Sequence, residues 1–259
     1  MIASLLIIAL TNAQPGLTSP DSEESAVTFA RPIEIEAGAS YGWMSNDIAN
    51  WNTQFLEVSR ALGRQSAFYG VARQSRRFEL SDLEVISGLS FPLHERWTTA
   101  CELSFSPTHR IAPQWSALVG EYFNFVGGWV YGIDLRMARY EPATVARFIQ
   151  SLELYWGRFR GAYSLSLNTL WGDRTVSSHQ VTLNYYYATR NSFGISYAMG
   201  SELERFGLMD ILSNHIVVLS LVGRHWVVPT WAISYEWGWN EMLNHYSQTG
   251  VRIGLRHEF

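Results

Sequence analysis

A serine and a histidine stand side by side at Ser178 and His179, shortly after Asp173 and Arg174. Serine, histidine and an acid are the groups that a hydrolase uses for nucleophilic catalysis. A lipid-modifying enzyme of the outer membrane would need them near one rim of its fold. Their spacing does not fix that geometry, and a polar loop accounts for the same residues. A membrane enzyme is therefore one alternative.

No other pattern of catalytic or cofactor chemistry is found in the sequence. The histidines form neither an HExxH motif nor a pair four residues apart, so we expect no metal site. Cys101 is the only cysteine, which excludes an intrachain disulfide. All 19 basic residues are arginines, which excludes a Schiff-base lysine and a phosphate-loop lysine. We predict that the protein binds no cofactor and is not an enzyme.

A larger set of chemically active residues is charged and lies within segments of alternating polarity. Such residues can pair with one another and fill an interior, or they can line a path for ions or sugars. Tyr155 and Tyr186 share this face and could serve as stacking steps for a sugar. The charged residues that we predict to line the lumen are Glu34, Glu36, Glu57, Glu84, Glu102, Asp134, Arg136, Glu153, Arg160, Glu236, Arg252 and Arg256.

The elements that position these residues have a period of two, as β-strands do. Many of them run for ten to fourteen residues, whereas a tilted strand needs about 9–11 residues to cross a membrane. We predict an all-β fold, a transmembrane antiparallel β-barrel of about 14 strands, with 12 possible. The predicted strands are 33–43, 51–62, 66–77, 80–91, 96–106, 113–124, 128–140, 146–157, 159–171, 177–189, 191–199, 214–225, 228–239 and 246–259.

The composition favours a barrel whose apolar face points outward. Charged residues make up 16% and aromatic residues 14%, and the polar face holds mostly Gly, Ser, Thr and Asn. A mean hydropathy of -0.05 excludes a bundle of membrane helices, and a net charge of -4 excludes wrapping of nucleic acid. A soluble β-barrel or sandwich that binds a ligand is the other alternative.

Tryptophans gather at the ends of the predicted strands, as in the aromatic girdles of membrane barrels. With a periplasmic N-terminus, they would form one belt at the outer rim and one at the periplasmic rim. The outer belt would hold Trp43, Trp51, Trp115, Trp171 and Trp239, and the periplasmic belt Trp97, Trp129, Trp156 and Trp226.

Three regions follow from these patterns. Residues 1–13 resemble a signal peptide, residues 14–32 a flexible polar linker, and residues 33–259 the barrel. The final strand should pair with the first, with Glu34 and Glu36 facing Arg252 and Arg256. We expect Gly200–Ser213 to be the longest extracellular loop.

Four short stretches and the closing strand carry a resemblance to known barrels. The last strand alternates and ends on Phe259, which resembles the signal that the barrel-assembly machinery recognises. The four stretches are Gly38-Ala39-Ser40-Tyr41-Gly42-Trp43, the strand from Trp51 to Leu62, Ser75-Arg76-Arg77-Phe78 and Gly88-Leu89-Ser90-Phe91-Pro92.

Over residues 33–259 the chain thus resembles the YaiO-type outer-membrane β-barrels. The resemblance implies a bacterial outer-membrane location and a link to surface polysaccharide export. We predict a narrow channel or an envelope-associated structural barrel. The expected partners are outer-membrane lipids, the barrel-assembly machinery and a saccharide, with no nucleic acid.

Overall fold

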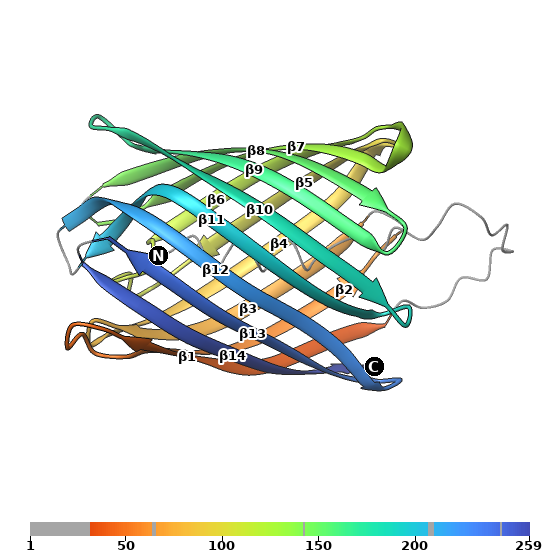
Figure 1. Ribbon diagram of the computed structural model, residues 1–259, viewed down its shortest axis with the longest axis horizontal. Coiled ribbons are helices and arrows are strands. Elements are labelled where there is room, and N and C mark those ends of the chain that lie inside the picture. Colours follow the sequence, from red (N-terminus) through yellow and green to blue (C-terminus); the bar gives the residue numbers. More distant parts are fainter. Residues whose placement is uncertain (1–31, 64–65, 142, 207–209, 244) are drawn as a thin grey trace, which may run out of the picture.

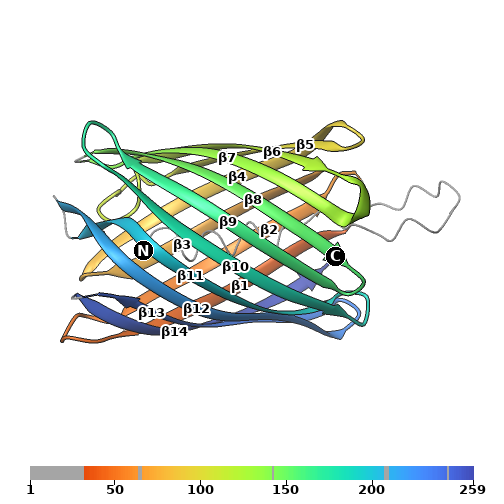
Figure 2. The ribbon, with the colours of Figure 1, turned by 45° about the horizontal axis from the view of Figure 1, so that its top comes forward.

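The chain forms a closed antiparallel barrel in which each strand pairs with its sequence neighbours and β14 pairs with β1 (Figures 1 and 2). The computed structural model describes residues 32–259 except 64–65, 142, 207–209 and 244. The strands are β1 (Ile33–Met44), β2 (Trp51–Ala61), β3 (Ala67–Arg77), β4 (Leu80–His94), β5 (Trp97–Phe105), β6 (Trp115–Asn124), β7 (Trp129–Arg139), β8 (Thr144–Trp156), β9 (Phe159–Leu170), β10 (Thr175–Tyr187), β11 (Asn191–Phe206), β12 (Asp210–Val228), β13 (Trp231–Met242) and β14 (Tyr246–Glu258).

The predicted fold class and strand number are confirmed. The strands run from 9 residues in β5 to 19 residues in β12, enough to cross a membrane at a tilt. One short 3-10 helix, η1 (Val126–Gly128), precedes β7. Among the described residues, no helix is both long enough and apolar enough to span a membrane.

The two faces of the wall are inverted relative to a soluble barrel. On β5, the outward Leu103 is 65% exposed, while its inward neighbour Glu102 is 5% exposed. On β4, the outward Val85 is exposed and the inward Glu84 is buried. A barrel surrounded by lipid needs this arrangement because its apolar side chains meet hydrocarbon and its polar side chains meet the lumen. The prediction of an outward apolar face is therefore confirmed.

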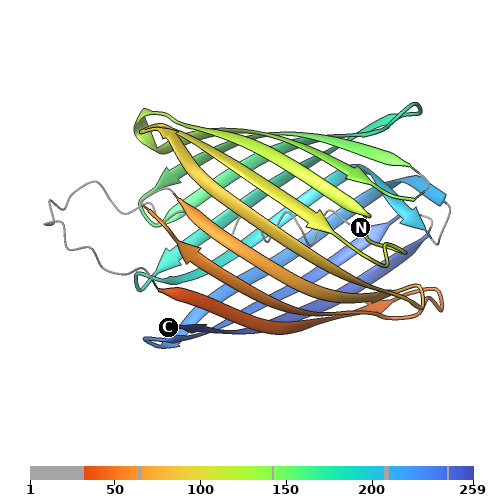
Figure 3. The same cartoon turned by 180° about the vertical axis from the view of Figure 1, so that it is seen from behind.

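Both ends of the barrel sequence meet at one rim, which we call the terminal rim; the opposite end is the far rim. The backbone N–H of Phe259 donates to the carbonyl of Ile33 at 2.9 Å. Seen from behind, the first strands lie beside the last blue strands (Figure 3). The longest connection that the structure describes is 106–114, at the far rim.

The predicted long loop over Gly200–Ser213 is wrong. Here β11 and β12 continue their ladder, with Gly200 opposite Ile216 and Phe206 opposite Asp210. The charged residues in this stretch suggested a loop, but backbone pairing does not depend on side-chain polarity. Only 207–209, which lie outside the described residues, separate the two strands.

The predicted signal peptide, residues 1–13, and nearly all of the predicted linker, residues 14–32, also lie outside the described residues. The described chain begins at Pro32, one residue before β1.

The barrel lumen as the candidate functional site

Alternation along the strands places all of the charged residues predicted for the lumen on the inward face. Their partners are set by the register between strands. Most of them are brought together into three hydrogen-bonded networks and one separate ion pair. We name the networks by their acids: the Glu36 network, the Glu102 network and the Glu153 network.

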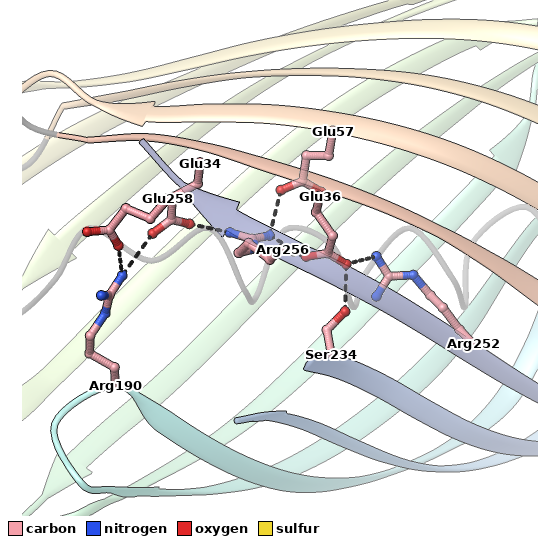
Figure 4. Close-up of polar contacts among 8 residues, drawn as sticks. All are labelled: Glu34, Glu36, Glu57, Arg190, Ser234, Arg252, Arg256 and Glu258. Carbon is pink, nitrogen blue, oxygen red and sulfur yellow. Dashed lines mark hydrogen bonds and ion pairs between the residues drawn. The ribbon is translucent and has the colours of Figure 1, made fainter. Parts of the chain in front are cut away.

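The Glu36 network joins the first strand to the last (Figure 4). Glu36 and Arg256 are direct cross-strand partners, and Glu36 Oε2 accepts a hydrogen bond from Arg256 Nε at 2.7 Å. The other oxygen, Oε1, accepts from Arg252 Nη2 at 2.9 Å and from Ser234 Oγ at 2.6 Å. Glu36 is 1% exposed, so these partners replace the water that the carboxylate loses.

Arg256 extends this network toward β2 and toward the terminal rim. Its Nη1 donates to Glu34 at 2.5 Å and its Nη2 to Glu57 at 2.9 Å. Glu34 and Glu258 in turn pair with Arg190, from the turn between β10 and β11 (Figure 4). The predicted contact between acids of the first strand and arginines of the last is thus confirmed.

The Glu102 network lies on another part of the wall, from β3 to β7. The carboxylate of Glu102 receives the Tyr69 hydroxyl and pairs with Arg136 Nη2 at 2.6 Å. Beside it, the Tyr122 hydroxyl donates to Asp134 Oδ1 at 2.5 Å. Sequence reasoning missed both tyrosines. Tyr69, Val71 and Arg73 alternate along β3 and so share one face. This alternation could have predicted that Tyr69 points into the lumen.

The Glu153 network is compact. Arg160 donates two hydrogen bonds to the Glu153 carboxylate, at 2.8 and 2.6 Å, and the Tyr155 hydroxyl donates a third at 3.0 Å. Tyr155, predicted as a sugar-stacking step, thus has its hydroxyl engaged with the wall. Separately, Arg73 Nε donates to Glu84 at 2.8 Å.

Glu236 is not drawn into a network. It faces Arg252 directly across β13 and β14. However, the Arg252 guanidinium turns to Glu36 and lies 4.1 Å from the centre of the Phe55 ring. Among the described residues, no hydrogen bond or ion pair of the Glu236 side chain is found. Tyr186 lies on the inward face of β10, two residues from Asn184.

The three networks run along the wall, except at the terminal rim, where Arg190 of the β10–β11 turn reaches Glu34 on β1 and Glu258 on β14. Arg256 on β14 reaches β1 and β2, and Arg136 on β7 reaches β5. Arg160 on β9 reaches β8. Each of these ion pairs joins strands that are neighbours or next neighbours around the barrel. The charges are therefore balanced locally, beside the strands that carry them.

An apolar cluster narrows the far end of the lumen on one side. Trp51 packs there against Ile216, Met242 and Tyr246, which come from β12, β13 and β14. Trp51 was predicted for the membrane-facing girdle, and this prediction is wrong, because the residue is 3% exposed. It lies at an odd position of β2, on the same inward face as Glu57.

The other predicted girdle tryptophans lie near strand ends. Trp43, Trp115, Trp171 and Trp239 lie toward the far rim, and Trp97, Trp129, Trp156 and Trp226 toward the terminal rim. The prediction that Trp226 belongs to the membrane-facing girdle is also wrong, because Trp226 shares the inward face of β12 with Ser220 and Arg224. The Arg190 guanidinium covers its ring at 3.4 Å.

The possible hydrolase residues do not assemble into a catalytic site. Ser178 is buried on the inward face of β10, whereas His179 points outward and hydrogen-bonds the Tyr163 hydroxyl at 2.7 Å. Asp173 and Arg174 form an exposed ion pair with each other. Within the described part of the chain, no three His, Cys, Asp or Glu side chains could together hold a metal ion.

Three solved structures illustrate the fold. The CymD monoaromatic hydrocarbon channel has a TM-score of 0.59 at 8% identity, with 88% of this chain and 87% of that chain covered. The translocator domain of autotransporter NalP from Neisseria meningitidis has 0.52 at 8%, covering 92% and 90%. Salmonella typhi OmpF in complex with daunomycin has 0.51 at 8%, covering 88% and 97%. At such identities the likeness shows the fold alone.

Family membership rests on the sequence. No curated protein matches the chain. Residues 33–204 match the family described as the YaiO membrane beta barrel domain. The match covers β1 to most of β11, well over half of the chain. This chain therefore belongs to the YaiO membrane beta barrel family, and it is a protein of the bacterial outer membrane.

Proposed function

We propose that this barrel is a narrow channel for small hydrophilic solutes. The observation that carries the proposal is the path of the ionic networks. Glu36, Glu102 and Glu153 are each satisfied by partners along the wall. No ion is needed from the opposite wall, so these charges give the lumen a polar lining without closing it. A barrel of fourteen strands lies between the filled barrels of about eight and the open porins of 16–18.

The apolar cluster at the far end limits what such a channel can pass. Trp51 on β2 contacts side chains of β12 and β13, so it bridges part of the lumen's width. Hydrophobic constrictions of this kind restrict passage by size and by loss of water. We therefore favour small solutes over long polysaccharide chains as the cargo. The surface polysaccharide link that the family resemblance implies would require this cluster to open.

Conductance of the refolded barrel in a planar bilayer tests the proposal. The unmodified protein should give small, steady single-channel currents. Trp51→Ala combined with Met242→Ala should increase the current, because both side chains belong to the constriction. Trp43→Ala is the matched control, since this tryptophan faces outward at 50% exposure, and it should leave the current unchanged.

The contrary result is also clear. The unmodified barrel and the double variant must first show β-structure by circular dichroism and heat-dependent mobility on gels. If the folded barrel and the folded double variant are then both silent, the channel proposal fails. The envelope-associated structural barrel takes its place.

A further inference from the structure

The terminal end of the seam between β1 and β14 brings two acids face to face. Glu34 and Glu258 are direct cross-strand partners, and alternation places both on the inward face. Like charges directly opposite each other destabilise a strand pair. Further along the same ladder Gly38 lies opposite Gly254, a pair that adds no contact between side chains. A cation at the two carboxylates would therefore strengthen the pairing at this end of the seam.

The cation comes from another part of the barrel. Arg190, in the turn between β10 and β11, pairs with Glu258 and also with Glu34, the latter at 3.5 Å (Figure 4). Its guanidinium covers the Trp226 ring, and its Nη1 donates to the Pro229 carbonyl at 3.2 Å. One side chain thus reaches from the β10–β11 turn, past β12 and β13, to both strands of the seam.

A second pair of facing acids shows what is unusual here. Glu36 and Glu57 are direct partners across β1 and β2, and Arg256 pairs with both. Arg256 lies within β14, where ladders on either side fix its backbone. Arg190 instead lies in a hairpin turn, and its side chain is 38% exposed. Among the described residues, it is the only cation that forms an ion pair with Glu258. It can leave this acid without breaking any strand pairing of its own.

The turn that carries Arg190 is strained. Ala188 has a φ of 47° and Thr189 a φ of 67°, in the left-handed region that residues other than glycine seldom adopt. A β-branched residue such as threonine is least suited to this region. Strained backbone persists where surrounding contacts hold it, and the contacts of Arg190 act on the next residue of the turn. Release of the guanidinium would let the turn relax.

We infer that Arg190 is a latch for the terminal end of the seam. When it is docked, its guanidinium holds Glu34 and Glu258 together. When it is released, the two facing carboxylates repel each other and the strand ends separate, which connects the lumen to the lipid beside the terminal rim. All three side chains are partly exposed, so added salt can screen these ion pairs. The latch does not require the lumen to conduct.

Amide hydrogen exchange, followed by mass spectrometry on the folded full chain in lipid nanodiscs, tests the latch. Arg190→Gln should speed exchange about threefold or more in 33–37 and 254–259, because two ion pairs are lost and the carboxylates repel. The far end of the seam, 41–44 and 248–251, should keep its rate. About 1 M NaCl should speed exchange at the terminal end of the unmodified chain and have little effect on Arg190→Gln.

Two further variants make the test specific. Glu258→Gln removes one of the facing charges. Arg190→Gln combined with Glu258→Gln should therefore exchange at the terminal end nearly as slowly as the unmodified chain. Arg158→Gln changes an exposed arginine in the neighbouring turn of the same rim, between β8 and β9, and should leave the exchange rates unchanged. Each variant must first show heat-dependent mobility on gels.

Equal exchange rates in Arg190→Gln and the unmodified chain would overturn the latch. So would a failure of Glu258→Gln to restore slow exchange, or faster exchange along the whole seam, which would indicate a general loss of stability. If Arg190→Gln does not fold, the salt response of the unmodified chain decides, and no acceleration at the terminal end overturns the latch. The currents in planar bilayers test the channel proposal separately, because amide exchange does not depend on conduction.

Discussion

Glu36 and Arg256 face each other across the seam that closes the barrel, and Glu36 Oε2 lies 2.7 Å from Arg256 Nε. One register fixes this contact, because a slip of one residue would turn one of the two side chains into the lipid. The seam is therefore held by the backbone ladder and by a buried ion pair specific to that register. Both can be tested in the folded protein.

A disulfide across the seam tests the register. In a Cys101→Ser background, Glu36→Cys with Arg256→Cys should crosslink in the folded barrel, because direct partners in a ladder lie within disulfide range. Glu36→Cys with Arg252→Cys is the control. Arg252 is opposite Ser40, four residues along the strand, and should not crosslink with position 36. Gel mobility with and without reductant reads the outcome; the reverse pattern would disprove the register.

Removal of Arg256 should destabilise the barrel strongly. Its guanidinium contacts three carboxylates, of Glu34, Glu36 and Glu57. Arg256→Gln leaves them without their main cation, and breaking a buried pair in this way costs about 3–5 kcal/mol. The free energy of unfolding can be measured by urea titration of the barrel in lipid vesicles. Adding Glu36→Gln to Arg256→Gln should recover part of the loss.

The exposed pair of Arg174 and Asp173 provides the comparison for that measurement. Arg174→Gln should change the free energy of unfolding by about 1 kcal/mol or less, since exposed ion pairs contribute little. If Arg256→Gln costs no more than Arg174→Gln, the Glu36 network does not stabilise the barrel.

Quenching by brominated lipids should separate the tryptophans by face. Trp43 is half exposed on the outside, while Trp51 is buried in the apolar cluster. Trp43→Phe should lower the fraction of tryptophan emission that the lipid quenches, and Trp51→Phe should raise it. The opposite changes in emission would place Trp51 against lipid.

For Trp51 and Trp226, the sequence predicted the position near a rim but not the face of the wall on which the side chain lies. A position at a strand end predicts that a tryptophan lies near a rim, because indole favours the membrane interface. It does not say which face the side chain takes; that depends on odd or even position along the strand. Trp51 and Glu57 both occupy odd-numbered positions of β2 and therefore lie on the same face. Alternation alone could have placed Trp51 inward.

Partner choice in the lumen could not be predicted from sequence. Alternation was enough to place Glu236, Arg252 and Glu36 on one face. Register then makes Glu236 the direct neighbour of Arg252 across β13 and β14. Yet the long Arg252 side chain bonds to Glu36, which Arg256 and Ser234 also contact, and not to Glu236. Such choices depend on side-chain reach in three dimensions.

Orientation in the membrane can be tested at two turns. We expect the terminal rim, with the tight turn that holds Arg158, to face the periplasm, and the far rim, with Asp173, to face the outside. In a Cys101→Ser background, Asp173→Cys should react with an impermeant maleimide on intact cells. Arg158→Cys should react only after the outer membrane is opened. The reverse order of labelling would invert the topology.

Asp82 should control the longest described loop, 106–114. Its Oδ1 accepts the backbone N–H of Arg110 at 3.0 Å, and its Oδ2 accepts those of Ile111 and Ala112 at 2.6 and 2.7 Å. Three donors on one buried carboxylate hold the loop against β4. Asp82→Asn replaces one acceptor oxygen with an NH₂ group that faces N–H donors, so the loop should open more often.

Trypsin can report this opening because the chain has no lysine and the loop contains a single arginine, Arg110. Hydrogen bonds to a charged group contribute about 1.5–3 kcal/mol, so cleavage after Arg110 in Asp82→Asn should be roughly tenfold faster or more. Asp173→Asn, in an exposed far-rim turn, should leave that rate unchanged. Mass spectrometry of the fragments gives the site and the rate. Equal rates in the two variants would mean that the strand ends on either side, and not Asp82, hold the loop.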